Sequence, residues 1–499
     1  MTGALLYVHG IVWGVPMLIL IIGVGSRILI RTRFLPLRML PEAVRRFFGQ
    51  FRESGKPDET SSWRALCTAL GATVGTGNIV GVAGAISLGG PGAIFWMWIC
   101  GLLAMGTKFA EATLAVRYRQ GRRGSYFGGP MYIIKEGMPG HWHILGAVYC
   151  ILGIIAAFGV GNATQINAVV CGINRLLQQS GRIQTLRRDL AMGLILAVLV
   201  GAVLMGGARR IGAAAELLVP AVSLFYMGLC VTVLVLRADR IPDALAMILQ
   251  GAFSPEAVTG GAVGSVFQAL RIGCCRGVFT NEAGMGTASI AHAGADVAHP
   301  VEQGLMGIVE VFLDTIVLCT MTALVILVSC VPIPYGMDNG MLTISAFSAV
   351  CGDWAALALT VCLGCFAVAT ILGWGLYGTR CAQFLFGERA WLPFAAVQTA
   401  AVIPGAVLKT QTVWRLSELF NGLMAIPNLI ALAVLTPELS RLIKEYIKKE
   451  GGTAAEGGNH ADFHQCQPLR ALSHEKVPSL RGGGGSAGKE DLSSEYRSA

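Results

Sequence analysis

Long apolar stretches, each about as long as a membrane-spanning helix, recur along the whole chain, and charged residues collect in the short segments between them. A bilayer core about 30 Å thick needs roughly 20 apolar residues in one helix. The pattern therefore predicts an all-α integral membrane protein with about eleven transmembrane helices. We expect them at about residues 8–30, 64–88, 92–116, 143–173, 190–207, 211–236, 260–290, 302–330, 354–385, 390–408 and 414–436.

Two spans carry a glycine-rich polar interruption, and the first of these reads "ATVGTGNIVG" over residues 72–81. Its hydroxyls and glycines resemble a phosphate loop, but the glycine spacing fits no dinucleotide fingerprint and no Lys-Ser/Thr pair follows. The polar side chains Thr73, Thr76 and Asn78 need partners in hydrocarbon, and Gly75 with Gly77 disfavours a continuous helix. A helix broken at membrane depth exposes N–H groups that suit a carboxylate and carbonyl groups that suit a cation.

The alternative for this stretch is an unbroken helix whose small residues allow close packing, which is sufficient for Gly81 and Gly84. A counterpart break would favour the first interpretation, and "RGVFTNEAGMGTAS" interrupts the seventh span over residues 276–289. Both breaks fall in the first helix of a set of five, spans two to six and seven to eleven. Because five is odd, the two sets run in opposite topology, which predicts an inverted repeat. A long loop without repeat symmetry remains the alternative.

These patterns divide the chain into four parts. Residues 1–63 form the first helix and a basic connection, 64–240 the first repeat, 241–440 the second repeat and 441–499 a disordered cytoplasmic tail rich in Gly, Ser and mixed charge. Such a tail cannot bury a core.

The composition changes the picture little, since 54% hydrophobic and 13% charged residues with a mean hydropathy of +0.62 fit a membrane protein. A net charge of +9 suggests nucleic acid in a soluble protein, but here Lys and Arg lie between apolar stretches. We therefore expect membrane lipid around the chain, with neither a nucleic-acid partner nor a protein partner indicated.

The basic residues also predict the orientation, because cytoplasmic loops are enriched in Lys and Arg. Segments 31–64 and 117–135 carry eight and five of them and fall on one face, whereas 331–353 carries none. The chain is then a multi-pass protein of the cell membrane with its N-terminus outside and its C-terminus in the cytoplasm. Four arginines on the predicted outer face are an exception: Arg175, Arg182, Arg187 and Arg188.

Further polar residues lie inside the predicted spans. Ionisable groups at membrane depth are functional candidates, although hydrogen bonding between helices remains an equal alternative for Glu216, Glu310 and Asp314. His292 and His299 are expected in a cytoplasmic turn, and no convergent acid, base or metal set is evident, so we expect no enzyme. Other polar groups of this kind are Asn162, Gln165 and Asn167 in the fourth span, with Thr370 and Trp374 in the ninth.

Seven ordered motifs between about residues 11 and 435 resemble the alanine or glycine:cation symporter family of bacteria and archaea. They read "TALGATVGTGNIVGVAGAISLGGPGAIFWMW", "FGGPMYII", "GNATQINA", "RGVFTNEAGMGTASIAHA", "HPVEQGLMGIVEVFLDTIVLCT", "ILGWGLYGTRC" and "FNGLMAIPNLIAL". The resemblance implies the leucine-transporter fold with one extra N-terminal helix. It also implies sodium-coupled uptake of a small neutral amino acid, alanine or glycine, by alternating access, without a cofactor beyond the transported ion.

The resemblance also implies site residues at both breaks and in the fourth and ninth spans. For the substrate these are Thr73, Gly75, Thr76, Gly77, Gln165, Thr280, Asn281, Thr370 and Trp374. For sodium they are the carbonyl groups of Gly71 and Val74, the Asn78 side chain and Thr370. Glu418 stands where the family often has Asp. Ala369 stands where the family usually has a hydroxyl, so the cation stoichiometry and the choice of sodium over proton stay open.

Three alternatives therefore accompany the main hypothesis. The first is a carrier coupled to protons or preferring glutamine or serine. The others are a membrane-embedded enzyme and an ion channel, although paired broken helices favour a carrier over a channel.

Overall fold

A computed structural model describes residues 2–53, 61–121, 125–179, 185–259, 261, 263–337, 339–408 and 410–455. Within these ranges the chain is helical, with an isolated bridge between Gln120 and Phe127 and no strand. The expected all-α class is therefore confirmed. The last part of the predicted tail, residues 456–499, and Arg182 lie outside the described residues.

The helices follow the predicted spans closely. In the first half they are α1 (Thr2–Val12), α2 (Val15–Arg31), α5 (Ser62–Thr73), η1 (Gly77–Gly81), α6 (Val82–Gly89), α7 (Gly92–Arg117), α9 (Ile144–Phe158), η3 (Gly159–Ala163), α10 (Thr164–Gln179), α11 (Leu186–Leu204) and α12 (Gly207–Leu236). In the second half they are α15 (Val266–Asn281), α16 (Thr287–His292), α17 (Pro300–Val311), η5 (Phe312–Cys319), α18 (Thr320–Val328), α20 (Asp353–Phe386), α21 (Trp391–Ala400), α22 (Val402–Gly405) and α23 (Thr410–Ala455).

Shorter helices connect the spans. They are α3 (Leu35–Arg38), α4 (Leu40–Glu53), α8 (Pro130–Gly137), η2 (Gly140–Trp142), η4 (Ala238–Arg240), α13 (Ile241–Phe253), α14 (Pro255–Thr259), α19 (Asn339–Cys351) and η6 (Glu388–Ala390).

Seven helices among the described residues are long and apolar enough to cross a membrane, and α5 with α6 forms an eighth span bent by 47°. The other three expected spans correspond to α11, to α15 with α16 and to α21 with α22. The last two are not single helices long enough to cross a membrane, because a polar break interrupts α15–α16 and a turn interrupts α21–α22. The molecule is thus consistent with about eleven transmembrane helices.

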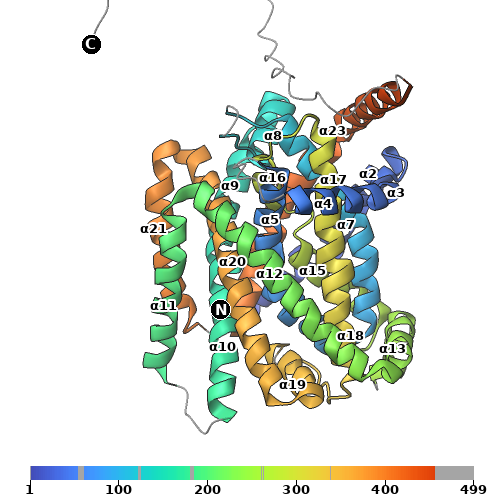
Figure 1. Ribbon diagram of the computed structural model, residues 1–499, viewed down its shortest axis with the longest axis vertical. Coiled ribbons are helices and arrows are strands. Elements are labelled where there is room, and N and C mark those ends of the chain that lie inside the picture. The colour runs from blue at the N-terminus through green and yellow to red at the C-terminus, as the bar shows by residue number, and fades with distance from the viewer. Residues whose placement is uncertain are drawn as a thin grey trace, which may run out of the picture. The chain divides into compact units, whose positions relative to one another are not determined.

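The inner part of the helix stack contains α5, α7, α15 and α17 (Figure 1). Helix α7 packs along both α15 and α17, and α5 packs between α12, α16 and α20. Glycines allow these close approaches: a Cβ at Gly273 would meet Ala93 and Trp96, and one at Gly304 would meet Phe109 and Thr113. Small residues at helix contacts drive association in lipid, where apolar burial between helices provides no gain.

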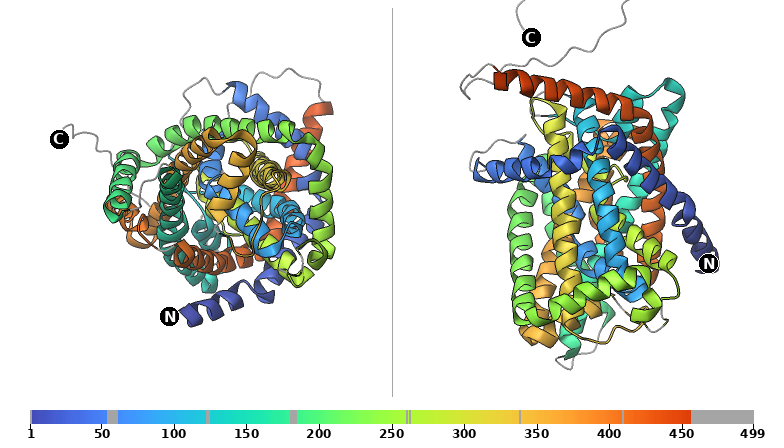
Figure 2. Two further views of the ribbon diagram at one scale, coloured as in Figure 1. Left: turned by 90° about the horizontal axis from the view of Figure 1, so that it is seen from below. Right: turned by 90° about the vertical axis from the view of Figure 1, so that its right-hand side faces the viewer.

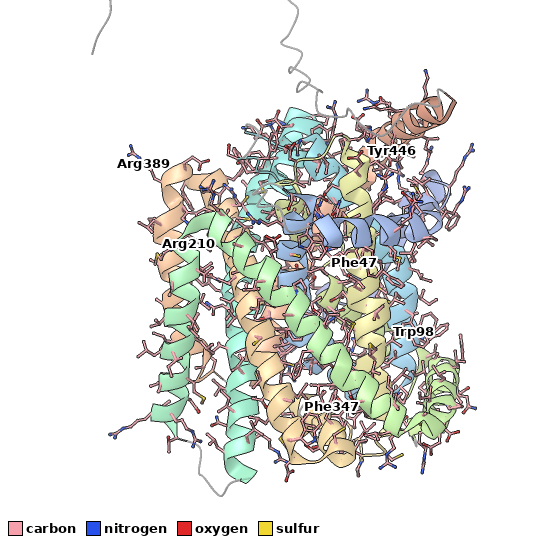
Figure 3. All side chains as sticks on the ribbon, viewed as in Figure 1. Phe47, Trp98, Arg210, Phe347, Arg389 and Tyr446 are labelled. Atoms are coloured by element: carbon pink, nitrogen blue, oxygen red, sulfur yellow. The ribbon has the colours of Figure 1, made fainter. Side chains whose placement is uncertain are left out.

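The other helices surround this centre. Figure 2 shows α12 curving around one flank and α1 projecting on another. Figure 3 places Arg210, Arg389 and Tyr446 toward one end of the helix stack and Phe347 toward the other. We call the first the basic end; α5 begins there, and α4 lies across the stack close by (Figure 1).

Two segments differ from the sequence-based expectation. Helix α23 continues to Ala455, so residues 441–455 are helical rather than a disordered tail, and Leu439, Leu442, Ile443 and Tyr446 are buried. His292 does not lie in an exposed turn but is fully buried at the end of α16. Packing against α7 and α5 explains the difference, because α16 is enclosed by both helices.

Candidate functional site

The predicted break in the second span is present. Helix α5 ends at Thr73, Val74 and Gly75 lie outside helical structure, and η1 and α6 continue at a different angle. Val74 adopts an extended conformation, with φ −75° and ψ 99°. The N–H of Gly75 donates to the Asn78 side-chain oxygen at 3.0 Å, so the polar residues of the motif stabilise the break itself.

Residues from three helices meet at this break. The Thr76 hydroxyl donates to Gln165 Oε1 of α10 at 2.9 Å, and the Thr370 hydroxyl of α20 donates to the Gly71 carbonyl at 3.2 Å. Gly75 is close to both partners, since a Cβ there would lie 2.5 Å from Thr370 Oγ1 and 3.6 Å from Gln165 Oε1. The structure thus brings together Gly71, Gly75, Thr76, Gln165 and Thr370, all buried; we call them the first-break cluster.

Asn78 faces another helix. Its side-chain N–H₂ donates to the Asp314 carboxylate at 2.6 Å and to the Asp314 carbonyl at 3.1 Å. Thr315 donates its hydroxyl to the same carboxylate and accepts from Asn281. Asn78 and Asn281 therefore both belong to a network centred on Asp314 of η5.

Three predicted residues take other positions. The Thr73 hydroxyl turns back to the Ala69 and Leu70 carbonyls of its own helix, and the Thr280 hydroxyl bonds the Gly277 carbonyl. A Cβ at Gly77 would lie 3.3 Å from Thr280 Cγ2, so these two positions adjoin across the contact between η1 and α15. Their roles toward substrate remain predictions.

The second break lies between α15 and α16 and contains three residues with positive φ. Glu282 adopts a left-handed conformation, φ 53°, and Gly284 and Gly286 have φ of 90° and 78°. Only glycine adopts such values without strain. Trp374 donates its ring N–H to Glu282 at 2.8 Å, and Thr287 donates its hydroxyl to the same carboxylate at 2.6 Å.

Trp374 is fully buried beside the second break and packs against Gly161 of the fourth span. A Cβ at Gly161 would overlap the Trp374 side chain, and Tyr377 contacts the ring edge-on. Trp374 thus joins α20 to both the η3 segment and the second break. It lies on the same helix as Thr370, which belongs to the first-break cluster, and close to it in sequence.

A buried chain of polar groups runs from the start of α5 toward the centre. Ser62 donates to Gln303 Oε1, Gln303 Nε2 lies 2.7 Å from His292 Nδ1, and His292 Nε2 lies 2.8 Å from Glu310. His292 thus contacts one carboxylate oxygen of Glu310, and the other oxygen is 3.2 Å from Lys108 Nζ.

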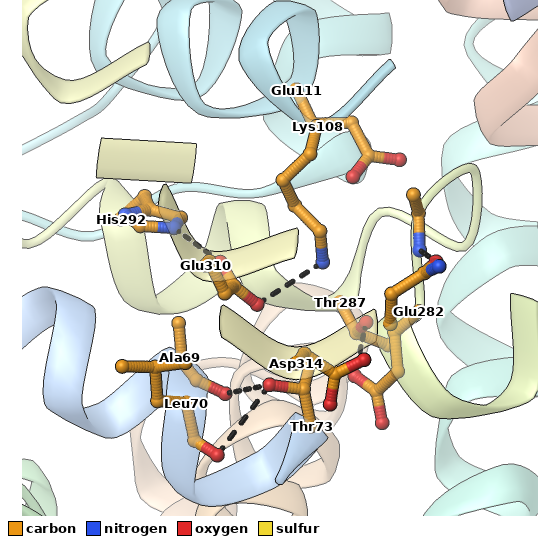
Figure 4. A network of polar contacts seen from close by, with 12 residues as sticks. Ala69, Leu70, Thr73, Lys108, Glu111, Glu282, Thr287, His292, Glu310 and Asp314 are labelled. Atoms are coloured by element: carbon orange, nitrogen blue, oxygen red, sulfur yellow. Dashed lines mark hydrogen bonds and ion pairs between the residues drawn. The ribbon is translucent and has the colours of Figure 1, made fainter. Parts of the chain in front are cut away.

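Figure 4 shows Lys108 and His292 converging on Glu310, with Glu111 one turn along α7. All of these side chains are enclosed, with at most 1% of the Lys108 and Glu310 side chains exposed. Lys108 interacts electrostatically with Glu310, Glu111 and Glu282, and Asp314 interacts with Glu310 and Lys108. Four carboxyl groups thus surround one ammonium group, and an excess of buried negative charge requires a cation or protons.

Sequence reasoning named Glu310 and Asp314 as candidates but missed Lys108, Glu111 and the burial of His292. A signal was available, since Lys108 and Glu111 are three residues apart inside the predicted span 92–116. Charged residues at that depth mark functional or structural networks. Glu216 forms an ion pair with Arg64 at 2.8 Å, as the structural alternative for this residue expects.

The model of the sodium:alanine symporter family matches residues 1–459. The chain belongs to the sodium:alanine symporter family. Two relatives with symporter names agree with this assignment. The sodium/alanine symporter AgcS of Methanococcus maripaludis is 38% identical over 435 residues, covering 86% of this chain and 93% of that protein. The probable sodium/glutamine symporter GlnT of Bacillus subtilis is 36% identical over 444 residues, covering 89% and 90%.

The solved structure of MhsT in complex with L-phenylalanine shows the same fold, with a TM-score of 0.54 at 14% identity. It covers 78% of this chain and 99% of MhsT. The predicted leucine-transporter fold is therefore confirmed. This member of the sodium:alanine symporter family is a multi-pass membrane transporter rather than an enzyme, and the family assignment supports amino acid transport and symport.

Proposed function

We propose that this transporter carries a small neutral amino acid, alanine or glycine, into the cell together with sodium, by alternating access at the two broken helices. The basic end then faces the cytoplasm and the N-terminus the outside. The observation that carries the proposal is the first-break cluster, where Gly75, Thr76, Gln165 and Thr370 gather at an opened helix. Backbone N–H groups at such a break suit the carboxylate of an amino acid.

The tight packing of the cluster supports a small substrate. Thr370 would touch even a single added methyl group at Gly75, and Trp374 is fully buried on the same helix, four residues beyond Thr370. We therefore expect a substrate with a short side chain. Gln165 also donates to the Val160 carbonyl at 3.0 Å, which fixes its amide for polar contact with the substrate.

The excess of buried carboxyl groups supports a transported cation. The carbonyl groups of Gly71 and Val74, the Thr370 hydroxyl and the Asn78 side chain are the proposed sodium ligands. Asn78 contacts the Asp314 carboxylate, whose negative charge favours a cation nearby. Bound sodium would stabilise the opened form of α5 and thereby couple the two solutes.

The ends of the molecule support alternating access. A cavity of about 140 Å³ lies at the basic end between α5, α12, α16 and α20 and reaches Thr68, one turn before Gly71. Toward the other end, Arg276 of α15 and Glu418 of α23 form an ion pair at 2.7 Å. This arrangement corresponds to a carrier closed at the outer end, with a vestibule toward the cytoplasm.

The test is uptake of radiolabelled alanine into liposomes that contain the purified protein. We expect accumulation only with an inward sodium gradient, and competition by unlabelled glycine and alanine above other amino acids. Uptake indifferent to sodium, lithium and pH gradients would contradict symport. Uptake driven by a pH gradient without sodium, or stronger competition by glutamine or serine, would favour the alternative carrier, for which the Ser62–Gln303–His292–Glu310 chain offers a series of hydrogen bonds.

A further inference from the structure

Glu111 is a fully buried carboxylate on α7 that is not among the proposed substrate or sodium ligands. One of its oxygens, Oε1, accepts three hydrogen bonds. The N–H groups of Gly284 and Gly286 donate to it at 2.9 and 3.0 Å, and Asn428 of α23 donates at 2.7 Å. Asn428 also donates to the Gly284 carbonyl at 2.9 Å. A single side chain therefore joins α7, the second break and α23.

The backbone explains why a carboxylate is needed there. Left-handed φ values at Gly284 and Gly286 turn both N–H groups to the same side, and neither can bond within α15 or α16. Buried N–H groups without an acceptor cost free energy, and converging donors of this kind favour an anion. Charge-assisted hydrogen bonds to a carboxylate are about twice as strong as neutral ones.

The first break differs in the group that satisfies it. There the Gly75 N–H donates to the neutral amide oxygen of Asn78, three residues further along the same chain segment. The nearest carboxylate in that network, Asp314, contacts Asn78 rather than the backbone of the break. The two breaks thus have different occupants: a neutral side chain at the first and a carboxylate at the second.

We propose that Glu111 is a positioning residue that fixes the second break by occupying its N–H groups with a permanent internal carboxylate. The substrate's own carboxylate is then directed to the first break, which sets the orientation of the bound amino acid. This last consequence rests on the function proposed above, whereas the positioning role does not.

The amide variant separates charge from shape. Glu111→Gln keeps an oxygen acceptor for the three donors and puts its N–H₂ where Glu111 Oε2 now lies, which has no hydrogen-bond partner within the described residues. Glu111→Ala removes the acceptor and leaves a cavity large enough for a small carboxylate. Leu114→Ala is the matched control, because it opens a buried cavity three residues further along α7 without removing an acceptor.

The experiment compares the thermal unfolding midpoints of the purified full chain and these variants in sodium formate and in sodium chloride at equal ionic strength, without amino acid. We expect formate to raise the midpoint of Glu111→Ala by several degrees relative to chloride, and to leave the wild type and Leu114→Ala unchanged. An equal effect of both salts on all variants would overturn the proposal, as would formate stabilisation of Leu114→Ala to the same extent as Glu111→Ala.

Alanine uptake provides the second measurement. Loss of an acceptor for buried N–H groups lowers uptake by roughly ten- to a hundredfold in Glu111→Ala. We expect formate to restore part of it, and Glu111→Gln to retain more uptake than Glu111→Ala. Wild-type kinetics in Glu111→Ala would overturn the positioning role.

The two proposals fail separately. If formate stabilises Glu111→Ala but the wild type takes up no alanine, the proposed function is wrong and the positioning role stands. If the wild type transports alanine and neither formate nor the amide variant restores anything, the role of Glu111 is wrong and the function stands.

Discussion

Gly75 shows at the scale of one residue why the first break needs glycine. The residue has no Cβ, so Thr370 and Gln165 approach its backbone from α20 and α10. A methyl group there would lie 2.5 Å from Thr370 Oγ1, closer than side-chain carbons come in folded proteins. The glycine thus serves close approach of two side chains as well as opening the helix.

We therefore expect Gly75→Ala to lower alanine uptake by at least about tenfold, because the added methyl group displaces Thr370 from the break. Gly364→Ala on the same helix as Thr370 is the control, since nothing lies within 4 Å of a Cβ at that position. Uptake and the amount of protein in the membrane are measured together. Equal uptake by both variants would show that the cluster is not tightly packed.

Gln165 and Thr370 are the side chains of the cluster that the substrate would contact. Truncation of Gln165 leaves the Thr76 hydroxyl without its acceptor, and truncation of Thr370 leaves the Gly71 carbonyl without its donor. We expect Gln165→Ala and Thr370→Ala each to raise the apparent KM for alanine by roughly tenfold or more, or to abolish uptake, while the protein still reaches the membrane. Wild-type kinetics in both variants would remove these residues from the pocket.

At the scale of helices, buried side chains join α15 to α23. Arg276 and Glu418 are 92% and 93% buried by side-chain area, and α1, where the extra N-terminal span begins, adds His9 at 2.8 Å from Glu418. Trp13, just beyond α1, donates to the Glu418 carbonyl, and Phe279 stacks on Trp414 nearby. The N-terminal segment therefore packs on the Arg276–Glu418 ion pair, which joins α15 to α23.

Breaking one partner of a buried pair costs more than removing both, because the remaining charge is left without compensation. We expect Glu418→Gln to destabilise the protein by about 3–5 kcal/mol. The double variant Arg276→Gln with Glu418→Gln should lose less stability than Glu418→Gln alone. Thermal unfolding and sodium-driven uptake of both variants and of Arg276→Gln alone give the comparison, and additive losses would show that the two side chains act independently.

For the molecule as a whole, the proposed orientation follows from the basic segments, and exposed residues at the two ends can test it. Asp353 begins α20, Arg389 lies in η6 just beyond the other end of α20, and both are exposed. In a background with the exposed Cys171 and Cys330 changed to serine, we expect Asp353→Cys to react with a membrane-impermeant maleimide added to intact cells. Arg389→Cys should react only after the cells are opened. The reverse result would place the basic end outside.

Much of this architecture was predictable because a lipid environment restricts the choices. Satisfying every backbone group in hydrocarbon requires helices, so apolar length alone located the spans. Glycine and polar residues in "ATVGTGNIVG" and "RGVFTNEAGMGTAS" marked both breaks, and the structure confirms that the helices are interrupted there. The division into repeats at residues 64–240 and 241–440 stays a prediction.

The sequence by itself thus determined the all-α membrane class, the two breaks and the candidate residues around them, since these depend on local composition. Tertiary structure decided which polar groups meet. It directed Asn281 to Thr315, turned the Thr73 hydroxyl to its own helix and enclosed His292 beside Glu310. It also placed Glu111 on N–H groups 173 and 175 positions away along the chain. No spacing in the sequence encodes such pairings, because they arise only when helices distant in sequence pack together.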